Sequence, residues 1–500
     1  MQTHWLAFGT SVMAAATVWA ASGTTDQPTR TLSLAQCRQL ALERNLNFRI
    51  SRFGPQSSWT AIATARATFD PSFTAGAAGS RTQAPDQLWF DASTASWVSK
   101  SQPVQRNLGS SIGVGKNFAF GTNMGLDLSN GWSSGSGLSN YASRVRFSVS
   151  QPLLKGFGRE VNESGIRLAR NNRDISLSQL ESDAISTTQQ VEEAYWDLVN
   201  AIEGRKVAEL SLEYAQQLLE RSRVRAESGA QAQREVLQAE AGVAIARQAI
   251  ISADAAVRAA EDRLKQLTNL TSDPNGWDLS LVPLDTPHVA AALAPVDTLL
   301  ATALGNSREL YRMEKSLESR RLSLRVRKNA LLPSLNASTG LTLNDGSASF
   351  SNSLDDIAKG SFPSWSAGLS LSVPIGNRRA EAEYRQASID LQSTGLQLES
   401  LRQQIHADVR SAVRRVETSR QQMAAAMESR RLQEANLESE QERLRLGLST
   451  NYDVLRLEKD LADARRAVLQ ARIEHEKALL ALDVATGRLL EVRNITIAGE

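Results

Sequence analysis

One helical hairpin occurs twice in this chain, 218 residues apart, and that duplication limits the possible folds more than any other feature. The sequence reads RVRAESGAQAQREVLQAEA around Gly229 and RLRLGLSTNYDVLRLEKDL around Gly447. Each glycine follows an arginine, Arg225 or Arg443, by four residues, and a helical pattern resumes after it. Glycine ends helices because it adopts the left-handed conformation at little cost. The pattern predicts two helices joined by a tight turn in each copy.

The duplication extends over almost the whole chain. Ala41 aligns with Ala303 at an offset of 262, and the same offset places Pro71 on Pro333. From Val191 onward the offset is 218, so the first copy carries about 44 extra residues in its middle. Five hundred residues are also too many for one ordinary core. We predict repeat 1 at 32–269, a linker at 270–295, repeat 2 at 296–490 and a C-terminal tail at 491–500.

Each repeat is predicted to hold a short initial helix, extended strands, one very long helix and a return helix. The long helices are expected at 161–228 and 379–446, and the return helices at 232–268 and 450–486. Each long helix would extend for about 102 Å, several times the width of an ordinary domain. Residues of the first one recur every seven positions, which favours supercoiled helices packed side by side. The two series are Val191, Leu198, Leu212 and Leu219, and Ala194, Ala201, Ala208 and Ala215.

The segments before the long helices alternate apolar and polar residues with a period of two. SLNASTGLTLN at 334–344, WSAGLSLSVP at 365–374 and RVRFSVSQP at 144–152 all show this pattern. Such strands are typical of an outer-membrane barrel with a wet interior, although a soluble sandwich would alternate in the same way. Residues 1–23 form an apolar run that ends in small residues, as in a signal peptide. A signal peptide implies export from the cytoplasm, which favours the outer-membrane barrel over the soluble sandwich.

Four strands with open edges cannot cross a membrane alone, because their edge groups would stay unpaired in lipid. We therefore expect several chains to close one barrel. The extra residues of the first copy include LGSSIGVGKNF and NMGLDLSNGW. As an extracellular hairpin they leave four strands per chain, whereas as membrane strands they give six; an assembly of three chains would then hold twelve or eighteen. The density of Gly and Ser, with Lys116 on the apolar face, favours twelve.

Composition argues against several classes of function. The formal net charge is +2 and no basic stripe is interleaved with aromatic residues, so no nucleic-acid partner is expected. The one cysteine, Cys37, excludes an intramolecular disulfide and a CxxC metal site. It lies well beyond the apolar run, which favours a buried helical cysteine over a lipid-attachment site. No catalytic, cofactor-binding or metal-binding constellation stands out, so the chain is not predicted to be an enzyme.

Together these features resemble the TolC-type outer-membrane efflux protein family over about residues 32–490. No single motif is specific, but the order, the duplication and the equal helix lengths are. The resemblance rests on ALERNLNF and ALGNSREL, strand-starting Pro71 and Pro333, strand-ending Pro152 and Pro374, VEEAYWDLV, and the two glycine turns.

The resemblance implies an α+β membrane protein with two internal structural repeats. A trimeric transmembrane β-barrel would continue as a long periplasmic α-helical barrel. The chain would be the passive exit duct of a tripartite efflux or type I secretion system in the outer membrane. Its partners would be two further copies, a periplasmic adaptor protein and, indirectly, an inner-membrane pump. The alternative is a periplasmic adaptor or coiled-coil scaffold, which would carry one helical hairpin rather than two.

The resemblance also makes the glycine turns the candidate functional site, at the periplasmic mouth. The residues expected to contact the adaptor are Arg225, Gly229, Arg443, Gly447, Ser449 and Thr450. The residues expected to line the mouth are Glu235, Gln238, Asp453 and Arg456. Because Arg456 and Gln238 accompany the two acidic residues, no acidic cation-selective ring is expected. Thr450 can also cap the second return helix, whereas the first copy has Ala232 at that position.

Overall fold

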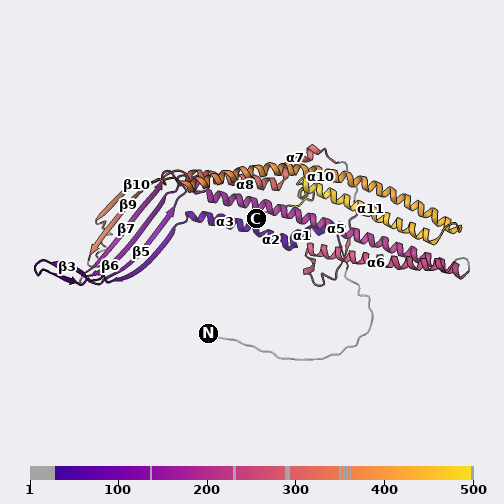
Figure 1. The fold of residues 1–500 in the computed structure, drawn as a ribbon, viewed down its shortest axis with the longest axis horizontal. Coiled ribbons are helices and arrows are strands. Elements are labelled where there is room, and N and C mark those ends of the chain that lie inside the picture. Colours follow the sequence, from indigo (N-terminus) through magenta and orange to yellow (C-terminus); the bar gives the residue numbers. More distant parts are fainter. Residues whose placement is uncertain are drawn as a thin grey trace, which may run out of the picture.

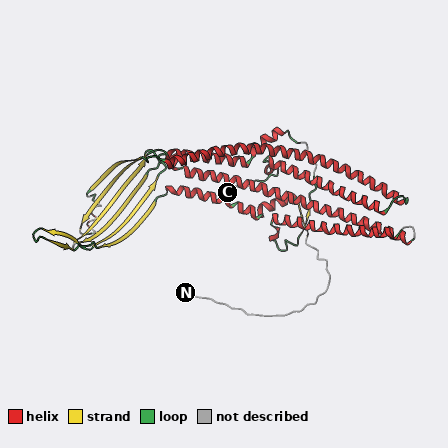
Figure 2. Ribbon diagram, in the orientation of Figure 1, coloured by secondary structure: helices red, strands yellow, loops and turns green. Residues whose placement is uncertain are grey.

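The protein is long and narrow, with a β-sheet at one end and helices running to the other (Figure 1). A computed structural model describes residues 29–496, except 136–137, 229–231, 288–292 and, within 348–361, all but 349, 352, 355, 359 and 360. The predicted signal peptide, 1–23, lies outside the described residues. Strands and helices occupy separate ends of the molecule, with short loops where they meet (Figure 2).

Two long helical hairpins form the half of the molecule that lies away from the sheet. Helix α5 (Ser164–Glu227) pairs with α6 (Gln233–Thr268), and α10 (Arg378–Arg445) pairs with α11 (Asn451–Ala485). Their apolar positions follow the heptads, since Val191, Leu198 and Ala215 are all buried. A residue in the left-handed conformation follows each return helix. It is Asn269, with φ 53°, directly after α6, and Gly487, with φ 67°, two residues after the end of α11.

Shorter helices keep the bundle four helices wide where the return helices stop. Helix α3 packs on α5, and α8 packs between α5 and α10, up to the edge of the sheet. Helices α5 and α10 extend along the whole bundle. At the end away from the sheet they pack with α6 and α11, and near the sheet they pack with α3 and α8. The bounds of the shorter helices are α1 Leu34–Arg44, α2 Leu46–Ser51, α3 Phe53–Arg66, α4 Arg159–Asn162, α7 Val296–Asn306, α8 Arg308–Ala330 and α12 Leu489–Val492, with 3-10 turns η1 Ala67–Phe69 and η2 Leu270–Ser272.

A compact apolar core surrounds the middle of α5. The first described residues, the segment between the repeats and the residues after α12 all meet there. Strand β1 (Thr29–Leu32) pairs in parallel with β8 (Ser280–Pro283) beside this core. Tyr195 is fully buried, and its hydroxyl accepts hydrogen bonds from the amides of Leu284 and Asp285, both at 3.0 Å. Cys37 of α1 is buried in the same core, as the sequence predicted, and burial raises the pKa of its thiol to about 12.

A buried carboxylate joins three distant parts of the chain beside that core. Glu192 of α5 is 1% exposed. It accepts hydrogen bonds from Arg493 at 2.9 and 3.0 Å and from Arg38 of α1 at 2.9 Å. Two guanidinium groups therefore satisfy both carboxylate oxygens, which a buried charge requires. This network ties α1 and the segment after α12 to the long helix.

Six strands form one antiparallel sheet, in the order β10-β9-β7-β6-β5-β2. The favoured prediction placed the two extra segments of the first copy in a hairpin beyond the sheet, and that placement is wrong, because they form β5 and β6 inside the sheet. Lys116 misled that prediction: it sits at the helix-facing end of β5, with its ammonium 5.4 Å from the Phe118 ring centroid, not in the middle of the apolar face. The strands are β2 Ser72–Thr82, β5 Gln105–Asn117, β6 Asn123–Gly135, β7 Leu138–Pro152, β9 Ser334–Ser347 and β10 Pro363–Ser372.

A separate hairpin, β3 (Gln87–Asp91) with β4 (Ser96–Lys100), extends from the outer end of the sheet (Figure 1). Among the described residues, no helix has a stretch long and apolar enough to span a membrane.

Candidate functional site

One face of the sheet carries an exposed apolar row that crosses all six strands at the same level. The ladder registers place its members side by side, and each is at least 44% exposed. The row consists of Phe73, Val114, Leu126, Phe147, Leu341 and Trp365. An apolar face of this extent, exposed on a single chain, is what a lipid-facing surface requires.

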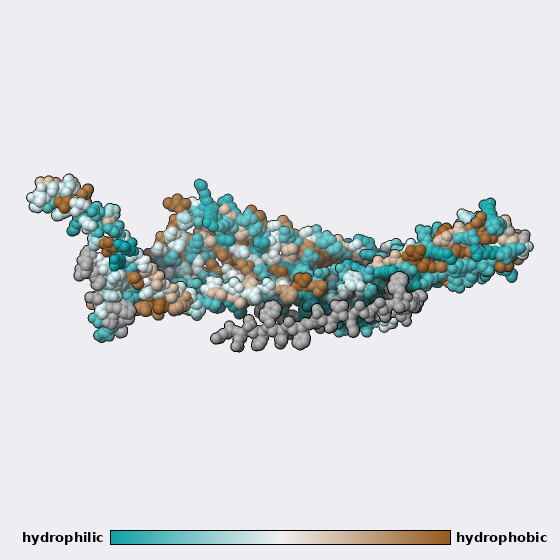
Figure 3. Space-filling view, turned by 90° about the horizontal axis from the view of Figure 1, so that it is seen from below, coloured by the Kyte–Doolittle hydropathy of each residue, from teal (hydrophilic) through white to brown (hydrophobic). Residues whose placement is uncertain are grey.

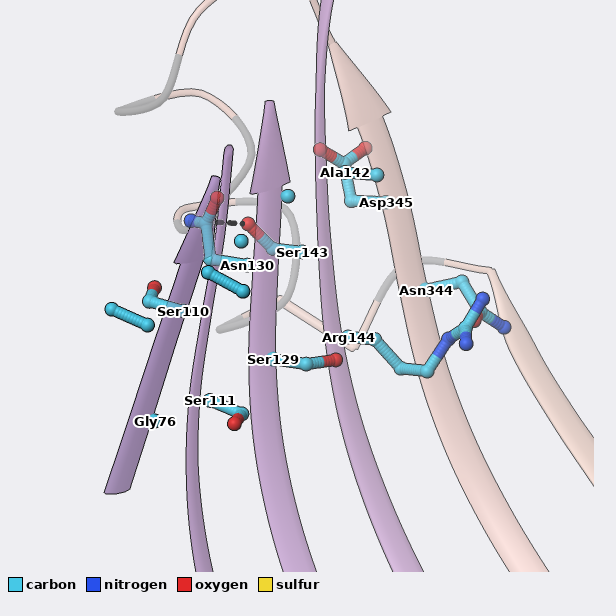
Figure 4. Close-up of a pocket in the computed structure, with 14 residues that line it drawn as sticks. Gly76, Ser110, Ser111, Ser129, Asn130, Ala142, Ser143, Arg144, Asn344 and Asp345 are labelled. Carbon is cyan, nitrogen blue, oxygen red and sulfur yellow. Dashed lines mark hydrogen bonds between the residues drawn. The ribbon is translucent and has the colours of Figure 1, made fainter. Parts of the chain in front are cut away.

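The opposite face carries small and polar residues in the same register. The neighbouring row consists of Thr74, Gly113, Asp127, Arg146, Thr342 and Ser364. Further from the helices, Arg144 of β7 donates a hydrogen bond to Asn344 of β9 at 3.0 Å, and the two side chains lie together in Figure 4. The sheet therefore has one face suited to lipid and one suited to water.

Both edges of the sheet are open in the part of the chain that the structure describes. Strand β2 pairs there with β5 alone, and β10 pairs with β9 alone. Exposed edge groups cannot remain unpaired in a membrane. The helices also expose apolar surface, since apolar side chains interrupt the hydrophilic surface along the long bundle (Figure 3). Exposed examples are Leu237, Ile245 and Ile251 of α6, and Ile389 and Leu396 of α10.

The second glycine turn ends helix α10 at the tip furthest from the sheet. Gly447 has φ 76°, its amide donates to the carbonyl of Leu444 at 3.1 Å, and the Leu448 amide donates to the carbonyl of Arg443 at 2.8 Å. These two hydrogen bonds form a Schellman motif. The left-handed conformation that the sequence predicted for Gly447 is confirmed.

Side chains on both sides of Gly447 stabilise the turn. Thr450 accepts from the amide of Asp453 at 3.3 Å and donates to its carboxylate at 2.7 Å, so the predicted cap is present. Arg456 lies 4.0 Å from the same carboxylate. Glu440 is a shared partner of Arg443, at 3.0 Å, and of the Ser449 hydroxyl. Sequence reasoning missed Glu440, because one glutamate among many on a long helix gives no signal.

The first glycine turn is described only in part, because Gly229 lies outside the described residues. Helix α6 begins at Gln233 after Ala232, which supplies no side-chain cap. Arg225 is exposed near the end of α5, and Glu235 and Gln238 are half-buried in the first turns of α6. The expected difference in capping between the two turns is therefore present.

A contact between the two hairpins was not predicted from the sequence. Asn451, at the start of α11, donates to the hydroxyl of Ser222 on α5 at 2.7 Å, and each residue is 1% exposed. The two residues are 229 positions apart, so no local pattern could reveal the contact. Two turns further along α11, burial raises the pKa of Glu458 to about 7, while the positive charge of Arg221 lowers it.

Comparison with solved structures shows which class of protein shares this fold. The chain aligns with the outer-membrane channel CmeC of Campylobacter jejuni, with a TM-score of 0.67, 17% identity, and coverage of 91% of this chain and 86% of that one. The outer-membrane protein VceC of Vibrio cholerae aligns with a TM-score of 0.65 and 15% identity, covering 91% of this chain and 96% of VceC. The fold is thus that of outer-membrane channels.

Sequence comparison identifies the family. The model of outer membrane efflux proteins matches residues 120–270 and 299–488, which is more than half of the chain. The outer membrane efflux protein BepC of Brucella suis biovar 1 (strain 1330) is 25% identical over 349 residues, which cover 69% of this chain and 72% of BepC. The chain belongs to the outer membrane efflux protein family. It is a transport protein of the outer membrane, not the periplasmic adaptor that was the alternative.

Proposed function

We propose that three copies of this chain form one continuous exit duct through the outer membrane and across the periplasm. The observation that carries the proposal is the six-stranded sheet with one apolar face, one polar face and two open edges. Joining β10 of one copy to β2 of the next satisfies both edges and places the polar face around a water-filled channel. The helices then close side by side into a tube that continues the same channel.

The proposed duct is passive, and it obtains its cargo from other proteins. Its tips at Gly447 and at the end of α5 would be the surfaces that a periplasmic adaptor engages, and the adaptor would join the duct to an inner-membrane pump. This assignment follows from the family resemblance and from the position of the tips furthest from the sheet. Glu235, Gln238, Asp453 and Arg456 would lie at the entrance, where the pairing of Asp453 with Arg456 argues against a purely acidic ring.

The test of the trimer is the mass of the purified protein in mild detergent, with the detergent contribution subtracted. We expect three chains per particle at full helical content by circular dichroism. The exposed apolar positions of α6 and α10 would be covered only in that assembly. A monodisperse monomer with the same helical content would contradict the proposal, since a single chain would then be stable with its edges open.

A further inference from the structure

Strands β5 and β6 are an insertion relative to the second repeat, and they lie in the middle of the sheet. In the part of the second repeat that the structure describes, β9 and β10 join the sheet, and they correspond to β2 and β7 through Pro71 with Pro333 and Pro152 with Pro374. The inserted pair stands between β7 and β2 in the strand order. Strand β6 pairs with β7, and β5 pairs with β2 along all of β2. The sheet therefore runs through the insertion, not around it.

The inserted strands lie at the same level of the sheet as their neighbours. Val114 of β5 and Leu126 of β6 belong to the apolar row, directly between Phe73 and Phe147. Their polar faces match as well. A β-carbon at Gly113 would come within 2.5 Å of the Asp127 carboxylate, so the glycine leaves space that this side chain occupies. The glycine content that argued against a membrane strand is thus part of how the strands pack.

The turn between β5 and β6 is fixed to the start of the helices. The Gly158 amide donates to the carbonyl of Phe120 at 3.3 Å, and the Asn117 side chain donates to the carbonyl of Thr68 at 3.3 Å. A β-carbon at Gly121, which has φ 90°, would come within 2.7 Å of the Gly156 carbonyl oxygen. The insertion therefore extends across the full height of the sheet, down to the level where the other strands meet the helices.

The width of six strands matches the width of the helices to which they connect. Strands about 4.8 Å apart and tilted by about 40° each occupy about 6 Å of a barrel's circumference, so six occupy about 38 Å and four about 25 Å. The four helices that reach the sheet, α3, α5, α8 and α10, would occupy about 32–40 Å at packing distances of 8–10 Å. Six strands continue the helical tube without narrowing it.

We propose that every chain contributes six membrane-crossing strands, so that the outer-membrane pore is an eighteen-stranded barrel. This rests on the closure by three chains proposed above. Such a pore is about half again as wide as one built from four strands per chain, because barrel diameter grows roughly linearly with strand number. The membrane pore is then as wide as the helical tube, and any selection of cargo by size occurs at the periplasmic tip.

The test places nitroxide spin labels on adjacent residues of an inserted strand and of a control strand. Leu128→Cys and Ser129→Cys probe β6, and Phe147→Cys and Ser148→Cys probe β7, each in full-length protein carrying Cys37→Ser and reconstituted in lipid. We expect Leu128 and Phe147 labels to collide mainly with oxygen, which concentrates in lipid, and Ser129 and Ser148 labels mainly with a water-soluble nickel chelate. The proposal is supported if collision partners alternate between adjacent labels on β6 as strongly as they do on β7.

Two other collision patterns would overturn it in distinguishable ways. If both β6 labels meet the nickel chelate while β7 alternates, the inserted hairpin lies outside the membrane and the trimeric duct survives. If neither strand alternates, the membrane barrel itself is wrong. The Ser148 label also measures barrel width once the label-to-label distance is converted to a Cα–Cα distance, because each label extends into the channel. The Ser148 Cα atoms of neighbouring chains should lie about 30 Å apart in an eighteen-stranded barrel and about 20 Å apart in a twelve-stranded one. The shorter distance would also overturn the proposal.

Discussion

Gly447 holds a backbone conformation that a side chain resists, in a place where a side chain would meet no obstacle. Its φ is 76°, and a β-carbon built there has nothing within 4 Å. Substitution therefore costs about 1 kcal/mol of backbone strain and no steric clash. Because the Schellman hydrogen bonds are made by the main chain, the turn itself should survive. Gly447 is thus a position where docking can be tested without unfolding the protein.

We predict that Gly447→Asp gives a normal outer-membrane trimer but reduces export and adaptor cross-linking tenfold or more. A charge forced into a docking surface costs several kcal/mol, and each 1.4 kcal/mol is about a factor of ten. Gly447→Asn is the matched control, because asparagine tolerates the left-handed conformation and adds no charge. Export by intact cells and cross-linking to the adaptor are the measurements. Normal export by the aspartate variant would mean that docking occurs elsewhere.

Substitution of Glu192 tests whether the buried ion-pair network at the middle of the molecule stabilises the fold. Glu192→Gln leaves Arg38 and Arg493 facing a neutral amide, so we predict a loss of about 2–3 kcal/mol in the free energy of unfolding and a lower thermal midpoint. Glu203→Gln is the control, since the exposed pair of Glu203 with Lys206 should contribute less than about 1 kcal/mol. Equal midpoints for the two variants would show that the network does not stabilise the fold.

At the scale of elements, the sequence predicts helices better than it predicts the number of strands. Heptads and glycine stops are local signals, and the observed α5 and α10 end within a residue or two of the glycine turns. Sheet membership is not local. Gly113 resembles a loop residue until its neighbour Asp127 is placed across the ladder, and Lys116 resembles an interruption until its position at the end of β5 is known. The link from Ser222 to Asn451 is likewise visible only in three dimensions.

The contact between α5 and α11 should weaken as pH rises. The Glu458 carboxyl has a folded-state pKa of about 7, above its ordinary value of 4.5, so the folded state binds the proton more tightly than the unfolded state. Its stabilising contribution is complete below about pH 4.5 and is lost as pH rises through 7. Partial exposure to water limits the change to about 1–2 kcal/mol.

We predict that Glu458→Gln removes this pH dependence and strengthens the contact at pH 8. Hydrogen exchange of the α11 amides near Asn451, compared between pH 5 and pH 8 after correction for intrinsic rates, is the measurement. Lys459→Gln serves as the control on the exposed face of the same turn. A wild-type protein whose protection near Asn451 is the same at both pH values would contradict the assignment.

At the scale of the whole molecule, the proposed duct makes each chain one sector of a tube. In that duct, neighbouring chains would pair the open edges of β2 and β10 and cover the exposed apolar residues of α6 and α10. Duplication explains how one chain supplies a wide sector, since each repeat contributes strands at one end and a helical hairpin at the other. The inserted strands then widen the sheet to match the helices.

The most direct measurement is disulfide cross-linking between the two edges of the sheet. Thr74→Cys on β2 is combined in turn with cysteine at Ser364, Ser366, Gly368 and Ser370 on β10, which share its face of the sheet, in a Cys37→Ser background and in native outer membranes. The account predicts that at least one combination yields a covalent ladder of one, two and three chains that stops at three, while each single-cysteine variant yields none. A ladder that ends at two or continues past three, or the absence of any cross-link in a protein that forms trimers, would contradict the closure of the barrel through these edges.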